Sequence, residues 1–74
     1  MMRIVKVRIH RAATTSREYD AITVHVGGLG LSADIVNDRQ IRQAKHLAES
    51  HEATWQVSPE LQSRVDAALS GESK

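Results

Sequence analysis

The sequence predicts an α+β domain in which an antiparallel sheet of two or three strands carries two helices packed on one face. Two observations lead to this fold class. Apolar and polar residues alternate in short stretches as far as residue 36, whereas apolar residues recur at helical spacing beyond residue 37. A run of strands followed by a run of helices, here in the order β-β-(β)-α-α, is typical of an antiparallel sheet with helices on one side.

The first two predicted strands cover residues 3–10 and 19–26. Alternation with a period of two, together with β-branched residues, is the signature of a strand with one buried face. The polar connection 11–18 is shorter than a parallel crossover requires, so we expect an antiparallel hairpin. The residues that the alternation places on the buried face are Val5, Val7, Ile9, Ile22, Val24 and Val26.

The register of this hairpin follows from the requirement that the core residues of both strands share a face. We expect Val5 opposite Val24 and Val7 opposite Ile22. The remaining residues then form an outward face that is rich in basic and imidazole side chains. On that face lie Lys6, Arg8 and His10 from the first strand, and Tyr19, Thr23 and His25 from the second.

A third strand is predicted at residues 31–36, after a flexible turn formed by residues 27–30. The apolar residues of this segment keep a period of two and stay outside the later helical stripe, which favours a strand. The alternative is a short helical turn that begins at Ser32, because a serine hydroxyl can cap a helix N-terminus.

The first helix is predicted to run to about His51, with Asn37 or Asp38 as its cap. Its apolar residues recur at the i, i+3, i+4, i+7 spacing that marks one face of a helix. The stripe consists of Ile41, Ala44, Leu47, Ala48 and His51.

The second helix is predicted to begin at residues 58–60, where the hydroxyl of Ser58, a proline and an acidic residue are the usual start signals. Gly71 is expected to end it. Between the two helices, residues 54–57 are expected to be extended or irregular. The apolar stripe of the second helix consists of Leu61, Val65, Ala68 and Leu69.

Length and composition limit the classes of function. With 74 residues the chain has room for one domain, which we place in residues 1–70, before a disordered polar tail in residues 71–74. Ten Lys and Arg against nine Asp and Glu leave a net charge of +1, which is too balanced to require a nucleic-acid partner. The absence of cysteine excludes disulfides and thiolate zinc sites, and it fits a reducing compartment.

The chain is expected to be cytoplasmic, with no membrane partner. No apolar stretch approaches the roughly 20 residues that a membrane-spanning helix needs. The N-terminal residues interleave charges with hydrophobic side chains, whereas an export signal has an unbroken apolar run after its basic start.

No pattern in the sequence predicts an enzyme, a cofactor or a metal site. Residues 28–33 read G-x-G-x-x-A, but a dinucleotide fingerprint needs a helix to begin at once, and none is predicted there. In the expected register His10 and His25 lie about 20 Å apart, at about 3.3 Å per residue. His46 and His51 are not three or four positions apart, as ligands on one helix face would be. Nucleophile elbows and paired carboxylates are also missing.

The outward face of the hairpin is the most informative surface in the sequence. Cations there are normal on a solvated sheet face, where they also discourage edge-to-edge aggregation. They can equally form an electropositive patch for phosphates or for an acidic protein surface, which Arg3 and Arg11 at the strand ends and Arg17 in the loop could extend. Trp55, the only tryptophan, closes the core or anchors an interface. The candidate partner-binding residues are therefore Lys6, Arg8, His10, Arg11, Arg17, Tyr19, His25 and Trp55.

These observations favour a small non-enzymatic protein-binding module, which acts as a regulator, inhibitor or adaptor of a larger protein complex. Its size and lack of motifs resemble those of accessory proteins of phages and mobile elements, an analogy from size alone. A homodimer is the favoured assembly, because a core without phenylalanine gains most from burying further apolar area. The alternative is a nucleic-acid-binding protein that uses the basic outer face of the hairpin.

Overall fold

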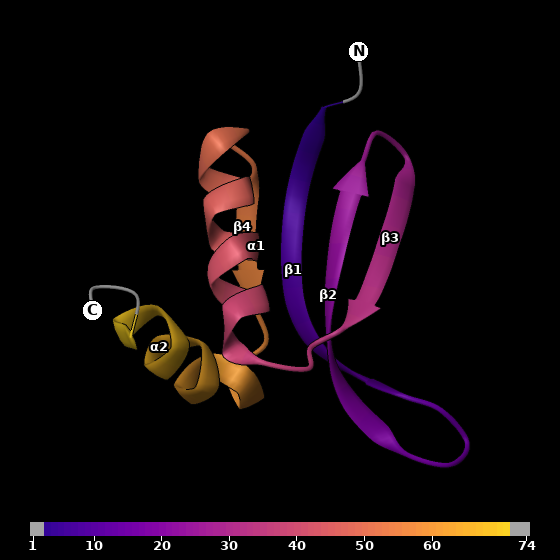
Figure 1. Ribbon diagram of the computed structural model, residues 1–74. Helices are drawn as coiled ribbons and strands as arrows, with labels where there is room; N and C mark the ends of the chain where they lie inside the picture. Colours follow the sequence, from indigo (N-terminus) through magenta and orange to yellow (C-terminus); the bar gives the residue numbers. More distant parts are fainter. Residues whose placement is uncertain (1–2, 72–74) are drawn as a thin grey trace.

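A four-stranded sheet with the strand order β3-β2-β1-β4 forms the framework of the molecule (Figure 1). The structure is a computed structural model that describes residues 3–71. Within these residues the elements are β1 (Ile4–Ala13), β2 (Glu18–Val26), β3 (Leu29–Asp34), α1 (Asp38–Ser50), β4 (Thr54–Val57), the 3-10 helix η1 (Pro59–Leu61) and α2 (Gln62–Ser70). The predicted α+β class is confirmed. The sheet is larger than the predicted two or three strands, and it is mixed rather than antiparallel.

The strand that sequence reasoning missed is β4, which was expected to be extended or irregular. It pairs parallel to β1, with Trp55 opposite Val7 and Val57 opposite Ile9. A parallel neighbour has to be reached by a crossover, and here α1 supplies it between β3 and β4. Four residues are too few for a convincing alternation, so this strand is specified by its long-range partner β1.

The register of the β1–β2 hairpin also differs from the prediction. Val7 lies opposite Val24 and Ile9 opposite Ile22, and the pairing is irregular between Ile4 and Lys6. This bulge shifts the alternation by one residue at the start of β1. Ile4 therefore packs against the core, whereas Val5, which was expected inside, is 47% exposed.

The third strand is confirmed, although it begins at Leu29 and ends at Asp34. A two-residue turn joins it to β2, and Gly27 adopts a φ of 62°, a conformation that favours glycine. Beyond the strand, Ile35 enters the core, and Val36 is 80% exposed.

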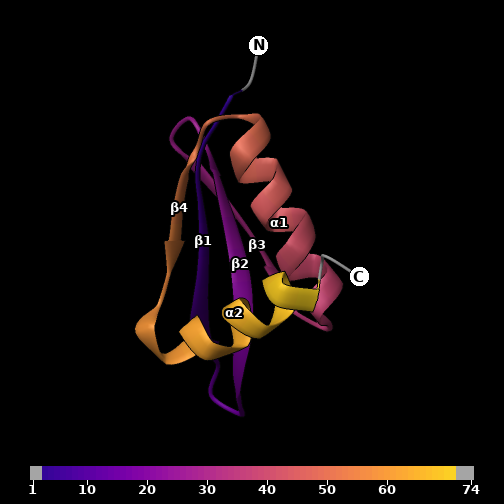
Figure 2. The same ribbon diagram turned by 90° about the vertical axis from the view of Figure 1, so that its left-hand side faces the viewer.

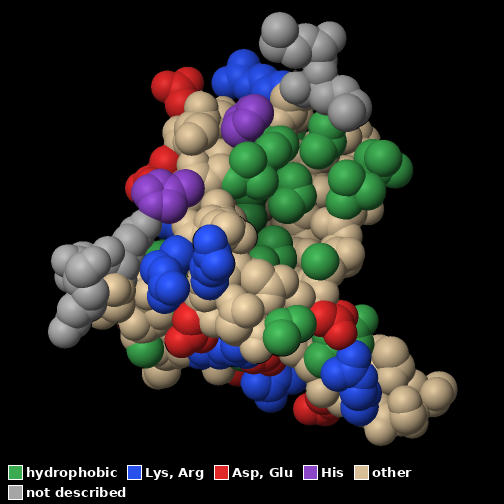
Figure 3. Space-filling model, viewed as in Figure 1, with side chains coloured by type: hydrophobic (Ala, Val, Ile, Leu, Met, Phe, Trp, Pro, Cys, Tyr) green, Lys and Arg blue, Asp and Glu red, His purple; other side chains and the backbone are tan. Residues whose placement is uncertain are grey.

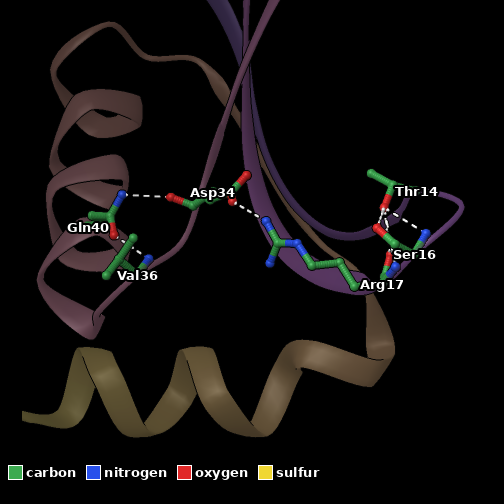
Figure 4. Close-up of polar contacts among 6 residues, drawn as sticks. All are labelled: Thr14, Ser16, Arg17, Asp34, Val36 and Gln40. Carbon is green, nitrogen blue, oxygen red and sulfur yellow. Dashed lines mark hydrogen bonds and ion pairs between the residues drawn. The ribbon is translucent and has the colours of Figure 1, made fainter.

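The junction between β3 and α1 is held by a capping box. The Asn37 side chain accepts a hydrogen bond from the backbone N–H of Gln40, whose own side chain accepts one from the N–H of Asn37. Gln40 also donates to the carbonyl of Asp34, as Figure 4 shows. The predicted N-terminal cap of the first helix is therefore confirmed.

The second helix ends as predicted but begins differently. Ser58 makes no side-chain capping hydrogen bond, so its predicted capping role is wrong. One turn of 3-10 helix starts the segment instead, before α2 continues to its C-cap at Gly71. The rest of the predicted disordered tail, residues 72–74, lies outside the described residues.

The hydrophobic core lies between β1 and the two helices, which pack on one side of the sheet (Figure 2). Val7 and Ile9 are fully buried beneath Ile41 from α1 and Val65 from α2. An α-helix is about 10 Å wide and neighbouring strands are about 4.8 Å apart, so α1 covers only about two strands. It lies over β1 and β4, which leaves the same face of β2 and β3 without a helix (Figure 1).

Candidate functional site

The uncovered part of the helix-side face is lined by apolar side chains. Residues directly opposite each other in an antiparallel pair point to the same face. Leu31 lies opposite Val24 and Ala33 opposite Ile22, so the inward residues of β3 continue the apolar rows of β2. Figure 3 shows these hydrophobic side chains gathered beside α1, over β2 and β3.

A groove of about 340 Å³ runs between this part of the sheet and α1. Ile22 and Val24, which sequence reasoning placed in the core, are only partly covered because they form its floor. We call this hollow the groove; its lining residues are Ile22, Val24, Gln40, Gln43, Ala44 and Leu47.

Two leucines of β3 extend the apolar surface beyond the groove. Leu29 is 61% exposed and Leu31 is 57% exposed. Single exposed leucines are ordinary, but a contiguous apolar patch beside a groove is a candidate site for binding another molecule.

The lining of the groove restricts its chemistry. None of the residues that form it carries an ionisable or nucleophilic side chain, and its polar members are Gln40 and Gln43. The amide of Gln40 is already used at the start of α1. The groove therefore can bury apolar side chains, while Gln43 offers an amide to the backbone or side chains of a bound segment.

The opposite, outer face of the sheet is polar. Lys6 lies opposite His25, Arg8 opposite Thr23, and His10 opposite Ala21. This arrangement confirms that the predicted basic residues share the outward face. The shifted register brings the two histidines closer than predicted, to about 13 Å, because four residues along the strand separate them.

Hydrogen bonds tie the centre of this outer face together. The Nε2 atom of His10 lies 2.7 Å from Oγ1 of Thr23, which lies 2.8 Å from Oγ of Ser32. The chain of polar contacts crosses from β1 to β3 and explains how the hydroxyl of Thr23 is buried on a face that carries no helix.

Lys6 and Arg8 are the cations that this face leaves free, because neither forms an ion pair with any residue in the described range 3–71. The Nε atom of Arg8 and the Nε2 atom of His25 are buried, and neither has a hydrogen-bond partner among residues 3–71. The charges of Lys6 and Arg8 form a small electropositive patch on β1, beside His25 of β2.

Arg11 does not extend that patch, and the prediction that it does is wrong. It lies opposite Asp20, in the row of β1 that faces the helices, with 3.1 Å between its Nε and the carboxylate. Arg64 of α2 reaches the same carboxylate and also lies 3.6 Å from Asp38. Asp20 thus joins the hairpin to α2 and, through Arg64, to the start of α1.

Asp20 is electrostatically perturbed by this position. Burial alone raises the pKa of its carboxyl, but hydrogen bonds from Arg64 and Arg11 outweigh that effect and lower the pKa below its ordinary value. In return, the hydrogen bond and charge of Asp20 raise the pKa of Arg11. The cluster is a structural link that stays charged at neutral pH.

Arg17 and Tyr19 stay on the outer face but bind each other. The guanidinium carbon of Arg17 lies 4.7 Å from the centroid of the Tyr19 ring, and its Nη2 atom lies 2.8 Å from the carboxylate of Asp34. Figure 4 shows Arg17 reaching across to Asp34 from the loop that Thr14 and Ser16 close. The charge of Arg17 is therefore compensated, and Tyr19 is covered on one side.

Trp55 lies on the helix side of β4, partly buried against the core. The Nζ atom of Lys45 on α1 sits 5.0 Å from its ring centroid, a cation–π distance. This position supports the core-closing role that sequence reasoning considered, and it separates Trp55 from the basic outer face.

Sequence reasoning missed Leu29, Leu31, Leu47 and Gln43 as site residues. The signal was present, since Leu29 and Leu31 alternate with the small residues Gly30 and Ser32. This alternation predicts a third strand, but periodicity alone does not indicate that the leucines of the strand stay exposed.

Residues 3–71 contain neither a metal-binding cluster nor a membrane-spanning helix. No group of three or more His, Cys, Asp and Glu side chains there is arranged to hold a metal ion. No helix in this range has the length and hydrophobicity needed to cross a membrane.

Comparisons with protein-family models, with curated proteins and with solved structures find no match to this chain. Its function therefore has to be argued from its own surfaces.

Proposed function

We propose that this chain is a non-enzymatic protein-binding module, a regulator, inhibitor or adaptor of a larger protein complex, and that it binds its partner in the groove. The observation that carries the proposal is the exposure of Leu29 and Leu31 beside a groove without ionisable lining. Such a surface favours burial of apolar side chains and offers no general acid, base or nucleophile.

The dimensions of the uncovered surface favour a helix as the bound segment. The uncovered strands β2 and β3 together are about 10 Å wide, which is about the diameter of one α-helix. An amphipathic partner helix laid beside α1 would complete the helix layer of this fold, with its apolar face on Ile22 and Val24. Helix-in-groove docking is a common mode of peptide recognition.

A comparison of variants tests this proposal. Leu47→Gln makes the wall of the groove polar while keeping a good helix former, and Lys6→Glu/Arg8→Glu alters only the outer face. A specific partner should be captured from lysate by the wild-type chain and by the outer-face variant, but not by Leu47→Gln. Formation of the purified complex should show a negative heat-capacity change, and its Kd should depend little on the salt concentration. Equal capture by all three chains would contradict the proposal.

The free cations Lys6 and Arg8 support a second candidate function, nucleic-acid binding by the outer face. Phosphate contacts make affinity fall with salt, with a slope of about −0.9 per neutralised phosphate in a plot of log K against log salt. Fluorescence anisotropy with labelled duplex and single-stranded oligonucleotides tests this. Weaker binding by Lys6→Glu/Arg8→Glu, with the magnitude of the salt slope reduced by about 2, would support it. No binding by the wild-type chain at low salt would exclude it.

Neither candidate function requires a cofactor. The cytoplasmic location inferred from composition, and the analogy with accessory proteins of phages and mobile elements, stay predictions.

A further inference from the structure

We propose that β3 pairs antiparallel with β3 of a second copy of this chain, so that the two sheets join across a two-fold axis at Leu31. This inference goes beyond the groove, because it concerns the edge of the sheet and not its face. It also gives a defined geometry to the homodimer that the composition favours.

The edge formed by β3 is unprotected. All six of its residues are exposed, and its sequence LGLSAD contains no Lys, Arg or Pro. Its one charged residue, Asp34, lies at the end of the strand and is already paired with Arg17. Edge strands of monomeric proteins usually carry charges, prolines or bulges that prevent pairing with another strand. The other edge, β4, is only four residues long.

The turn between β2 and β3 determines which backbone groups of the edge are free. A two-residue turn makes Val26 and Leu29 a hydrogen-bonded pair, and such pairs then alternate along the ladder. Leu29, Leu31 and Ala33 therefore bond to β2. The even-numbered residues Gly30, Ser32 and Asp34 direct their N–H and C=O groups away from the sheet.

One of these outward groups is already occupied. The carbonyl of Asp34 accepts a hydrogen bond of 2.8 Å from Nε2 of Gln40, which agrees with its outward orientation (Figure 4). Gly30 and Ser32 keep both of their outward backbone groups for a neighbouring strand.

These free groups select one register. Opposite residues must share a face, so the leucines of one copy must lie opposite odd-numbered residues of the other. Gly30 opposite the partner's Ser32 uses every free donor and acceptor of both residues, which gives about four backbone hydrogen bonds. This register places Leu31 opposite the partner's Leu31, and Leu29 opposite the partner's Ala33.

The edge strand is complementary to itself in charge as well as in its backbone donors and acceptors. In the selected register Asp34 lies opposite the partner's Gly28, so no like charges meet across the axis. The net charge of the whole chain is only +1, which gives little repulsion between two copies. A second copy therefore satisfies the requirements for the next strand of the sheet.

Single cysteines provide a direct test, because the natural chain contains none. In a non-hydrogen-bonded antiparallel pair the Cα atoms are about 4.5 Å apart, which is within the range for a disulfide. Leu31→Cys should therefore form a disulfide-linked dimer under mild oxidation. Leu29→Cys is the matched control, because its thiol would lie about 13 Å from the partner's equivalent thiol. Equal cross-linking of both variants, or none in Leu31→Cys, would overturn the proposal.

A pair of variants at Gly30 tests the edge without cysteine. A Cβ added at Gly30 would meet Thr23 at 3.6 Å and the His25 ring at 3.7 Å, which are ordinary contacts, so Gly30→Ala should fold and dimerise. Gly30→Pro removes the outward donor and blocks the edge, and it should give a folded monomer. Light scattering up to about 1 mM should show a concentration-dependent dimer for the wild-type chain and for Gly30→Ala.

The outcomes separate this proposal from the proposed function. A folded Gly30→Pro chain that still dimerises, or a wild-type chain that stays monomeric throughout, would overturn the edge pairing and leave the groove untouched. If Gly30→Pro does not fold, the cysteine pair still decides. Leu47→Gln should lose the groove partner while it still forms the dimer.

Discussion

The link between the hairpin and the helices through Asp20 leads to the most quantitative prediction. Asp20→Asn removes the charge that holds Arg64, a residue 44 positions away in the chain. Exposed ion pairs contribute about 0.2–1 kcal/mol, whereas hydrogen bonds to charged groups in less exposed positions contribute about 1.5–3 kcal/mol. Asp20 is largely buried but Arg64 is partly solvated, so we expect the loss of their contact to cost about 1–2 kcal/mol.

The pH dependence identifies the cause of that loss. The pKa of Asp20 is lowered in the folded state, so its stabilising contribution is present in full above the unfolded pKa of about 3.9. The contribution disappears as the pH falls through the folded pKa, because the carboxyl is then protonated in both states. The difference between Asp20→Asn and the wild-type chain should therefore be largest at neutral pH and should vanish in acid.

Thermal unfolding followed by circular dichroism measures this difference. A loss of about 1–2 kcal/mol corresponds to a decrease in Tm of about 6–13 °C for a chain of 74 residues. Asp66→Asn is the matched control, because Asp66 is exposed and its contact with Gln62 survives the change to an amide. An unchanged Tm for Asp20→Asn at neutral pH, or a deficit that persists undiminished at pH 2, would refute the reasoning.

Three further predictions concern the local structure. Asn37→Ala removes half of the capping box and should lower stability by about 1 kcal/mol in urea denaturation; an unchanged midpoint would contradict the capping role. The Cβ added by Gly27→Ala would meet no atom within 4 Å, but alanine would have to adopt a φ of 62°. We therefore expect the free energy of unfolding to fall by about 1 kcal/mol through backbone strain alone, and an unchanged free energy would contradict this turn conformation. Ile9→Ala should cost about 2–5 kcal/mol, whereas Val36→Ala at an exposed position should change stability by less than about 0.5 kcal/mol; similar effects of the two would place the core elsewhere.

The elements that could be predicted from the sequence are those whose signals are local. Alternation identified the first three strands, and the cap at Asn37 identified the start of α1. Features that depend on distant residues were missed or wrong. The bulge that exchanges Ile4 for Val5 depends on how β1 packs under the helices, and β4 exists because β1 pairs with it. Short segments of this kind carry no periodicity of their own.

The features of the candidate site also divide into those that a local sequence pattern predicts and those that it does not. The outward position of Lys6 and Arg8 follows from alternation alone. The position of Arg11 on the other face follows from the same alternation, because it lies in the row of Val7 and Ile9; it was mispredicted because the first strand was expected to end at residue 10. The groove was not predictable, because it results from the width of one helix compared with that of four strands. Composition indicates that the core is small, but it does not indicate which part of the sheet stays uncovered.

The exposed area of Leu29 and Leu31 bears on both proposals, partner binding in the groove and pairing of the β3 edge. Full burial of a leucine contributes about 2 kcal/mol, and Leu29 and Leu31 are 61% and 57% exposed, so about 1 kcal/mol remains for each. The leucines of two copies then contribute at most about 4 kcal/mol, from which the entropic cost of association has to be subtracted. Edge pairing alone should therefore be weak. A helix bound in the groove would pack on Ile22 and Val24 and hold β3 in place. It would then lower the ordering cost of edge pairing, so partner binding and dimerisation should strengthen each other. Sedimentation of the chain with its purified partner should give a lower dimer Kd than sedimentation of the chain alone, and an unchanged Kd would separate the two surfaces energetically.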